Sequence, residues 1–214
     1  MRFTAGLNLI FFDDNLILHN HMEQTNPESV TIGKQIWMTR NLNITTFRNG
    51  DSIFQAKNEG EWLEASQAKK PACCFQDFHP ANEARYGRLY NWYAVGDPRG
   101  ISPEGWHVPN DREWLELIDS VGGEFASMKL KSKQGWRDRY NGTNESGFGG
   151  LPGGGCTYGG GFIFQHQYGF WWGSTVDKNG AASTVVLFDM SQTIGRYTYD
   201  KTLGQSVRCL KDAV

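Results

Sequence analysis

The chain has 214 residues, of which 26 are glycine and 14% are aromatic. The glycine content argues against a long-helix or coiled-coil protein, because glycine interrupts helices, and the aromatic content argues against disorder. With 21 basic and 23 acidic side chains the net charge is -2, which excludes the basic surface that binds nucleic acid or an anionic membrane. No apolar run approaches the roughly 18 residues of a membrane span.

The first residues do not share the pattern of the rest. The apolar run Leu7-Asn8-Leu9-Ile10-Phe11-Phe12 ends at Asp13, so it is too short for the core of a signal peptide. We interpret residues 1–23 as a leader, with Met22 as an alternative start. Since no linker divides the remainder, we expect residues 24–214 to form one domain.

Several short elements are predicted in the first half. Apolar and polar residues alternate around a Gly33-Lys34 turn, which predicts a β-hairpin over residues 30–42. Composition predicts a helix over residues 59–69, with Asn58 as its cap, and another over residues 89–95.

The strongest helical pattern lies in residues 109–123. Asn110 and Glu113 have the spacing of a capping box, and Gly122-Gly123 supplies the end. Apolar residues recur between them with helical spacing at Trp114, Leu117, Ile118 and Val121.

The second half changes character. Residues 147–161 hold nine glycines, which indicates tight turns and close backbone approach. Strand-like runs follow at residues 161–164, 170–175, 183–189, 194–199 and 205–210. This order predicts an α+β fold in which the late strands pair as a meander.

Few residues suggest catalysis or metal binding. Cys73, Cys74, Cys156 and Cys209 lack zinc spacing, so we interpret them as small buried thiols, while a Cys156–Cys209 bridge stays open. Trp106 is predicted to anchor the core. His107 is predicted to be a surface or hydrogen-bonded histidine, because no second ligand stands at metal spacing. We therefore expect no metal and no cofactor.

Aromatic residues concentrate directly after the glycine-rich block. Because a strand alternates its faces, about half of them are expected to point outward, where rigid rings suit binding. For each single residue, a place in the core is an equally good interpretation. The candidate binding face comprises Tyr158, Phe162, His166, Tyr168, Trp171, Arg196, Tyr197 and Tyr199.

A series of motifs in chain order carries a family resemblance. The motifs are the segments 30–42, 86–95 and 103–109, the pair Glu113-Trp114, the segment 147–154, Trp172-Gly-Ser-Thr175 and Ser206-Val-Arg-Cys209. Together they resemble the Fibrobacter succinogenes major paralogous domain family. The resemblance implies a C-type lectin-like fold, in which two helices flank a small antiparallel sheet with long glycine-rich loops.

The resemblance also implies a function. It suggests a non-catalytic module that recognises a protein or glycan ligand, related to variable receptors diversified by retroelements. The alternative is a thiol-dependent enzyme of formylglycine-generating type, which would use Cys156 and Cys209. In the family, arginine is usual at the position of Cys156, and Ser102 replaces a cysteine that could pair with Cys209. The family suggests a bacterial surface or secreted location, although no signal peptide is recognisable and a cytoplasmic location stays open.

Overall fold

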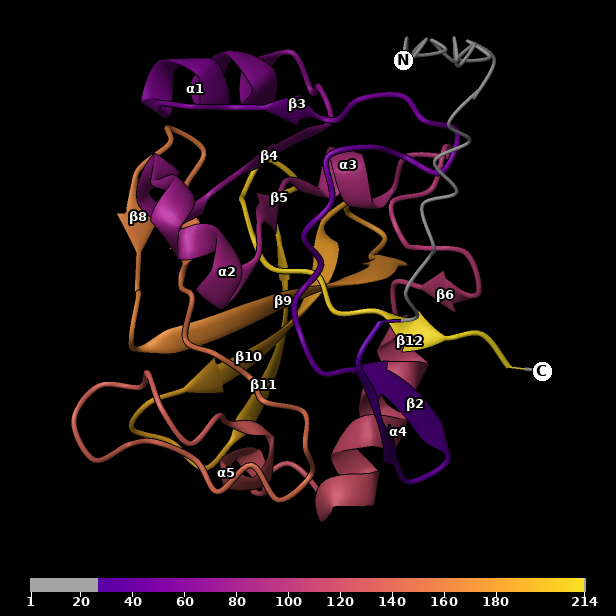
Figure 1. Cartoon of the computed structure of the whole chain (residues 1–214), viewed down its shortest axis with the longest axis vertical. Coiled ribbons are helices and arrows are strands. Elements are labelled where there is room, and N and C mark those ends of the chain that lie inside the picture. Colours follow the sequence, from indigo (N-terminus) through magenta and orange to yellow (C-terminus); the bar gives the residue numbers. More distant parts are fainter. Residues whose placement is uncertain (1–26, 214) are drawn as a thin grey trace, which may run out of the picture.

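The structure is a computed structural model that describes residues 27–213. The predicted leader, residues 1–23, lies outside the described residues. The described chain is a mixed α+β structure with short helices and several small sheets, as the order of the sequence patterns predicts (Figure 1). None of its helices is both long and apolar enough to cross a membrane.

The two ends of the domain meet in one sheet. Its strands are β1 (Ser29–Ile32), β2 (Gln35–Met38), β6 (Trp106–His107) and β12 (Leu210–Lys211), in the order β1-β2-β12-β6. The predicted hairpin is confirmed, because β1 and β2 pair across Gly33, whose φ of 61° suits glycine. The predicted last strand is shorter than expected. Within residues 205–210, Gln205 and Ser206 form only isolated bridges, and the strand begins at Leu210.

Three of the five predicted late strands pair as a meander, whereas the run at residues 161–164 pairs with another strand instead. The strands of the meander are β9 (Tyr168–Val176), β10 (Ala182–Phe188) and β11 (Ile194–Tyr199), with β10 in the middle and antiparallel to both neighbours. The β10–β11 register runs without interruption from Ala182↔Tyr199 to Leu187↔Ile194. The β9–β10 register shifts between Ala182 and Thr184. The shift affects β9, whereas the edge strand β11 pairs with β10 without a bulge.

The remaining strands form two smaller sheets. One contains β3 (Phe54–Gln55), β4 (Ala72–Cys74) and β5 (Leu89–Tyr90), and the other contains β7 (Gly155–Cys156) and β8 (Phe162–Ile163). The helix predicted over residues 89–95 is wrong in its first part. Leu89 and Tyr90 pair with β4, and the helix α3 (Trp92–Val95) begins only after Asn91. The Asn91 side chain caps α3 by accepting from Ala94 N, and it also accepts from Ala72 N of β4. It therefore holds the chain at the point where β5 ends and α3 begins.

The two longest helices agree with their sequence signals. In α1 (Glu59–Gln67), Asn58 accepts from Glu61 N as the predicted cap. In α4 (Asp111–Val121), both halves of the predicted capping box are formed, and Gly122 ends the helix with a φ of 113°. The shorter helical segments are η1 (Gln76–Phe78), η2 (Pro80–Asn82), α2 (Glu83–Tyr86) and α5 (Ser127–Leu130).

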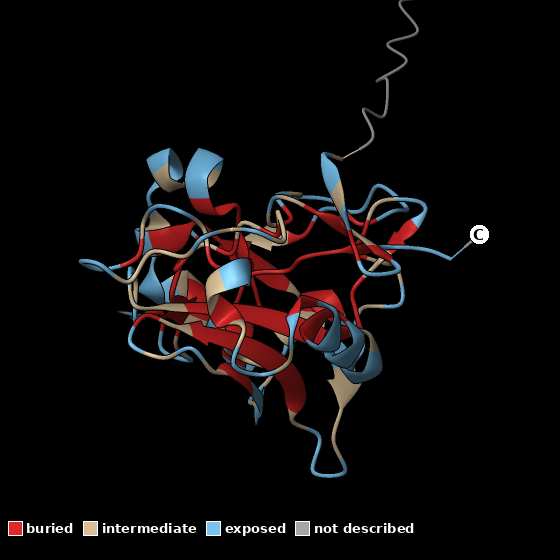
Figure 2. Cartoon of the chain, turned by 90° about the horizontal axis from the view of Figure 1, so that it is seen from below, coloured by how far each residue is buried: buried red, intermediate tan, exposed pale blue. Residues whose placement is uncertain are grey.

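The core occupies both faces of the long sheet, and the exposed residues lie around it (Figure 2). Adjacent tryptophans of β9 point in opposite directions. Trp171 packs with Trp37, Trp114 and Phe148, whereas Trp172 packs in a second cluster. Trp106 is buried, which confirms its predicted anchoring role. A third cluster beneath α1 includes Trp62, Cys74 and Cys156.

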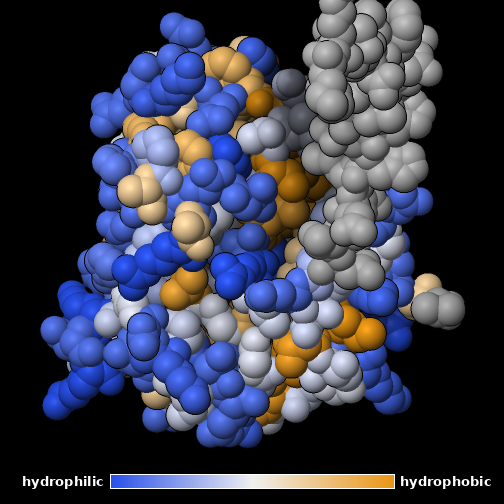
Figure 3. All heavy atoms as spheres, in the orientation of Figure 1, coloured by the Kyte–Doolittle hydropathy of each residue, from blue (hydrophilic) through white to orange (hydrophobic). Residues whose placement is uncertain are grey.

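The surface seen in the orientation of Figure 1 is mostly hydrophilic (Figure 3). Hydrophobic side chains appear there in separate patches between hydrophilic ones. Large apolar side chains that are exposed over the described chain include Phe125, Tyr158, Phe164, Met190 and Tyr197. Single exposed apolar residues are ordinary, so a candidate site has to be a group of them in mutual contact.

Candidate functional site

Six aromatic side chains gather on one face of the long sheet, and we call this group the aromatic face. Its members are Phe164, Tyr168, Phe170, Phe188, Tyr197 and Tyr199. The strand registers explain the grouping. Tyr168 of β9 pairs with Phe188 of β10, and side chains two residues apart share a face, which adds Phe170. On β11, the same alternation places Tyr197 and Tyr199 beside them.

The rings of the aromatic face form a closed circuit of contacts. Phe164 stacks on Tyr168 with 4.6 Å between ring centroids, and Tyr168 meets Phe188 edge-on at 5.0 Å. The circuit continues from Phe188 to Tyr197 at 6.4 Å, to Tyr199 at 6.1 Å, to Phe170 at 6.2 Å and back to Phe164 at 6.4 Å. These separations lie in the range in which aromatic pairs attract one another.

Exposure divides the aromatic face into a base and a rim. Phe170 is 7% exposed and forms the base, while Tyr197 is 50% and Phe164 is 42% exposed at the rim. Tyr168, Phe188 and Tyr199 are half-buried between them. Rings that are fixed by neighbours yet open to solvent provide contact area at low entropic cost. The geometry therefore suits binding.

A glycine on β11 makes room for two of these rings. A Cβ at Gly195 would lie 2.5 Å from Tyr197 Cε2 and 2.9 Å from Phe188 Cε2, closer than side-chain atoms pack. The rings of Tyr197 and Phe188 thus lie directly over the main chain of Gly195. Any larger residue at this position would displace them.

The loop that carries Phe164 is backbone-strained. Phe164 has a φ of 59° and His166 a φ of 65°, which non-glycine residues rarely adopt. The loop is held because His166 N donates to Pro152 O, and Arg137 N donates to His166 O at 2.7 Å. It also packs on Gly154, where a Cβ would collide with its main chain. Strain that is maintained by the surroundings is a feature of functional sites.

A small pocket adjoins the aromatic face. It has a volume of about 70 Å³, and Phe164, Phe170 and Tyr199 form part of its apolar wall. Gln205 adds a polar group, and its Oε1 accepts a hydrogen bond from Thr184 Oγ1 at 3.0 Å. Burial raises the pKa of Tyr199, and the neighbouring Tyr197 and Tyr168 raise it further, so its hydroxyl is a neutral donor at neutral pH.

Three of the eight predicted site residues belong to the aromatic face: Tyr168, Tyr197 and Tyr199. The prediction is wrong for Trp171, which is fully buried and donates from Nε1 to Asn41 Oδ1 at 2.9 Å. Arg196 is exposed, but it alternates with the two tyrosines and therefore points to the opposite face of β11.

The other three predicted residues lie off the aromatic face. Phe162 packs edge-on against Phe78 with 4.9 Å between centroids. Tyr158 is exposed in the turn between β7 and β8. His166 is exposed, and its Nδ1 lies 2.9 Å from Gly135 O, so the ring is tied to another loop.

Sequence reasoning missed Phe164, Phe170 and Phe188 as members of the site. Phe188 is the last residue of a buried strand, so the sequence around it looks like that of a core strand. Strict alternation along β9 and β11 contains the signal for the correct sorting, because it separates Trp171 from Phe170 and Arg196 from Tyr197.

The four thiols are buried and free, as their predicted role as small buried residues requires. Cys156 and Cys209 belong to different core clusters. Burial raises the pKa of the Cys209 thiol to about 12, despite the neighbouring Arg208. A reactive thiol needs a lowered pKa, so Cys209 does not have the feature that the enzyme alternative requires of it.

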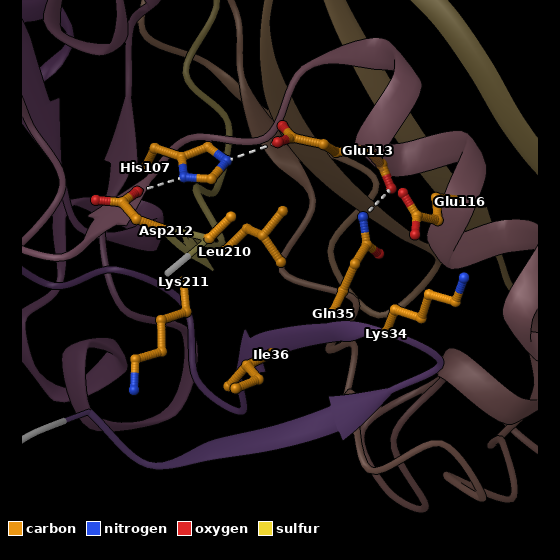
Figure 4. A pocket seen from close by; sticks show the side chains of 10 residues that line it. Lys34, Gln35, Ile36, His107, Glu113, Glu116, Leu210, Lys211 and Asp212 are labelled. Carbon is orange, nitrogen blue, oxygen red and sulfur yellow. Dashed lines mark hydrogen bonds and ion pairs between the residues drawn. The ribbon is translucent and has the colours of Figure 1, made fainter.

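A second pocket, of about 460 Å³, surrounds His107 (Figure 4). His107 Nδ1 lies 2.6 Å from Asp212 Oδ1, and Nε2 lies 2.9 Å from Glu113 Oε1. Burial lowers the pKa of His107, but the hydrogen bonds and charges of Asp212 and Glu113 outweigh this effect and raise it. Both ring nitrogens are engaged, which confirms a hydrogen-bonded histidine and leaves no free nitrogen for a ligand. Within residues 27–213 no group of three acidic, histidine or cysteine side chains could hold a metal ion.

Comparison with known proteins identifies the family of the chain. Searches of curated proteins and of solved structures find no significant match. The family model of the Fibrobacter succinogenes major domain matches residues 30–211, from the start of the hairpin to β12. The matched range contains all the motifs that resemble this family. Since it covers most of the sequence, the chain belongs to the Fibrobacter succinogenes major domain family.

Proposed function

We propose that this chain is a non-catalytic recognition module that binds a protein or glycan ligand on the aromatic face. The observation that carries the proposal is the closed circuit of six rings, open at Tyr197 and Phe164 and supported from below by Phe170. Tyrosines supply both apolar area and a hydroxyl, and so they dominate many binding surfaces. The six side chains of this face are all phenylalanine or tyrosine, so the face contains no histidine, carboxylate or amine that could act as a general base.

The scaffold is proposed to be C-type lectin-like. Support comes from the two longest helices, α1 and α4, from the three-stranded antiparallel sheet, and from the long glycine-rich connection between residues 147 and 161. In the variable receptors that such folds include, late strands display the varied residues. The aromatic face likewise lies on the late strands β9, β10 and β11. A role as a variable receptor, and a location at the bacterial surface or outside the cell, are parts of this proposal.

The test is binding of the protein to glycan and peptide arrays. The double variant Tyr197→Ala/Tyr199→Ala is expected to lose at least about tenfold in affinity, because exposed aromatic anchors dominate such interfaces. The matched control is Tyr158→Ala, which removes a tyrosine of similar exposure (45%) from outside the circuit and should bind normally. Equal binding by the double variant and the wild type would refute the proposal.

A further inference from the structure

The free edge of the long sheet is the feature that extends the proposed function. In the sheet order β11-β10-β9, strand β11 pairs on one side with β10. Its residues Arg196, Tyr197 and Thr198 are exposed. An edge strand presents unpaired N–H and C=O groups, and these are a template for another strand.

The hydrogen-bond pattern identifies which groups face outward. Ile194 N donates to Glu124 O at 2.6 Å, so the main chain of Ile194 faces away from β10. In an antiparallel pair the direction alternates, which places the N–H and C=O of Arg196 and Thr198 on the same outer side. Among residues 27–213, these four groups have no hydrogen-bond partner.

Beyond Ile194, which is covered by its hydrogen bond to Glu124, the edge is accessible. Strand β11 has no proline, and its register with β10 has no bulge, whereas natural edge strands are often protected by such features. A groove of about 500 Å³ lies between α4 and the sheet, and its wall includes Trp114 of α4 and Val185 of β10. The groove also reaches residues 196–199 of β11, so this part of the strand is open to solvent on the α4 side as well.

We propose that the protein partner supplies an extended peptide segment that adds to β11 as a fourth strand of the sheet. This inference rests on the proposed function and assigns a protein, rather than a glycan, as its ligand. The outward groups of Arg196 and Thr198 repeat about every 6.8 Å, the two-residue repeat of a strand, so an extended main chain matches them all. A glycan has no such repeat of donors and acceptors.

The side chains of β11 define the sequence pattern of the added peptide. Alternate peptide side chains on one face would contact Tyr197 and Tyr199, at the rim of the aromatic face. Those on the other face would lie beside Arg196 and Thr198, where the guanidinium favours a polar group. The peptide is thus expected to alternate apolar and polar residues, as in other recognition by strand addition.

The test uses peptides selected from a phage-displayed random 12-residue library against the full chain. Thr198→Pro removes the outward N–H of Thr198 without removing a hydrogen bond to β10, and Thr198→Val, which keeps this N–H, is the control. Selected peptides should bind Thr198→Pro at least about tenfold more weakly than Thr198→Val. In the wild-type complex, the amides of Arg196 and Thr198 should change from fast to slow hydrogen exchange, a readout that does not depend on the variant folding.

Other outcomes would overturn the inference. They are equal binding to both variants, amides of Arg196 and Thr198 that still exchange rapidly in the complex, a library that yields no binder, and a dimer in light scattering with these amides already protected. Glycan binding that needs Tyr197 and Tyr199 but tolerates Thr198→Pro would refute strand addition and leave the recognition function intact.

Discussion

The guanidinium of Arg208 is joined to the side-chain oxygen of Asn41 by two hydrogen bonds, 2.7 Å from Nη2 and 3.1 Å from Nε. Arg208 is fully buried and stacks over the Phe148 ring at 4.4 Å. Its Nη1 donates to the carbonyls of Met38 and Phe148. Burial lowers the pKa of Arg208 to about 9, so the group is still charged at neutral pH. Neutral oxygens from two distant segments, residues 38–41 and Phe148, thus hold one buried cation.

Removing Asn41 should destabilise the protein strongly. Asn41→Ala deprives Arg208 of two hydrogen bonds and Trp171 Nε1 of its acceptor, and the buried cation cannot reach water. We expect a loss of about 3 kcal/mol in the free energy of unfolding, measured by urea denaturation. The exposed Asn43 is the control, and Asn43→Ala should change stability by less than about 0.5 kcal/mol. Equal effects of the two substitutions would contradict this account of Arg208.

Gly195→Ala should disrupt the aromatic face. The new methyl group would displace the rings of Tyr197 and Phe188, and overpacking of this kind costs about 1–3 kcal/mol. The near-ultraviolet circular dichroism of the tyrosines should change together with the melting temperature. Gly159→Ala is the matched control, because a Cβ at Gly159 has no neighbour within 4 Å. An unchanged tyrosine signal in Gly195→Ala would show that the methyl group fits without displacing the rings and would contradict the prediction.

His107 should make stability depend on pH. Asp212 and Glu113 raise its folded-state pKa above that of the unfolded chain, which is about 6.5. The folded protein therefore binds the proton more tightly, and the resulting stabilisation is full below the unfolded pKa and is lost as the pH rises through the folded pKa.

The measurement is the difference in unfolding free energy between wild type and His107→Gln from pH 5 to pH 9. This difference should shrink as the pH rises. A titration of the His107 ring by NMR gives its pKa directly, and a value below that of an unfolded peptide would oppose the prediction.

Lys131 should give the opposite dependence at higher pH. Its Nζ is buried and donates to the carbonyls of Asp189 and Ser191 at 3.0 and 3.2 Å. Burial lowers its pKa to about 8, although the charge of Asp189 opposes this effect. Between this pH and the unfolded pKa of about 10.4, the unfolded chain binds more protons, so stability should rise with pH.

The variant Lys131→Met removes this titration and provides the comparison. Relative to it, the wild type should gain stability from pH 8 to pH 10.5. The exposed Lys133 is the control, and Lys133→Met should follow the wild type across the range. A flat difference between wild type and Lys131→Met would exclude a lowered pKa at Lys131.

The buried thiols should be unreactive in the native protein. Burial raises the pKa of Cys73 to about 11 and that of Cys209 to about 12, so neither forms a thiolate near neutral pH. Titration with a disulfide reagent should label none of the four cysteines until denaturant is added. Rapid labelling of Cys156 or Cys209 without denaturant would revive the thiol-enzyme alternative.

The sequence predicts best those elements that depend on local signals. The Gly33 turn, the capping box of α4 and the late meander involve neighbouring residues, and each is present in the structure. Leu89 and Tyr90 show where local reasoning stops. Their composition suits a helix, but pairing with β4 makes them a strand, because tertiary contacts override weak propensities.

The candidate site was only partly predictable for a similar reason. Tyr197 and Tyr199 could be found from their strand pattern, but the burial of Trp171 depends on Trp37, Trp114 and Phe148, which are distant in sequence. The environment of His107 likewise depends on Asp212, 105 residues away. Spacing along the chain does not predict contacts between residues so far apart. Alternation within a strand predicts only which face of the sheet a side chain lies on.

The pairing of Leu210 with Trp37 has a consequence for synthesis on the ribosome. Strand β2 needs β12 as its second neighbour, yet nearly the whole domain separates them in sequence. The N-terminal hairpin can form early, but Trp37 and Met38 must wait for the last segment, which also brings Arg208 to Asn41. Long-range closure of this kind slows folding. A nascent chain halted before β12 would therefore expose a half-built core to chaperones and proteases, and the domain should mature only as its final strand emerges.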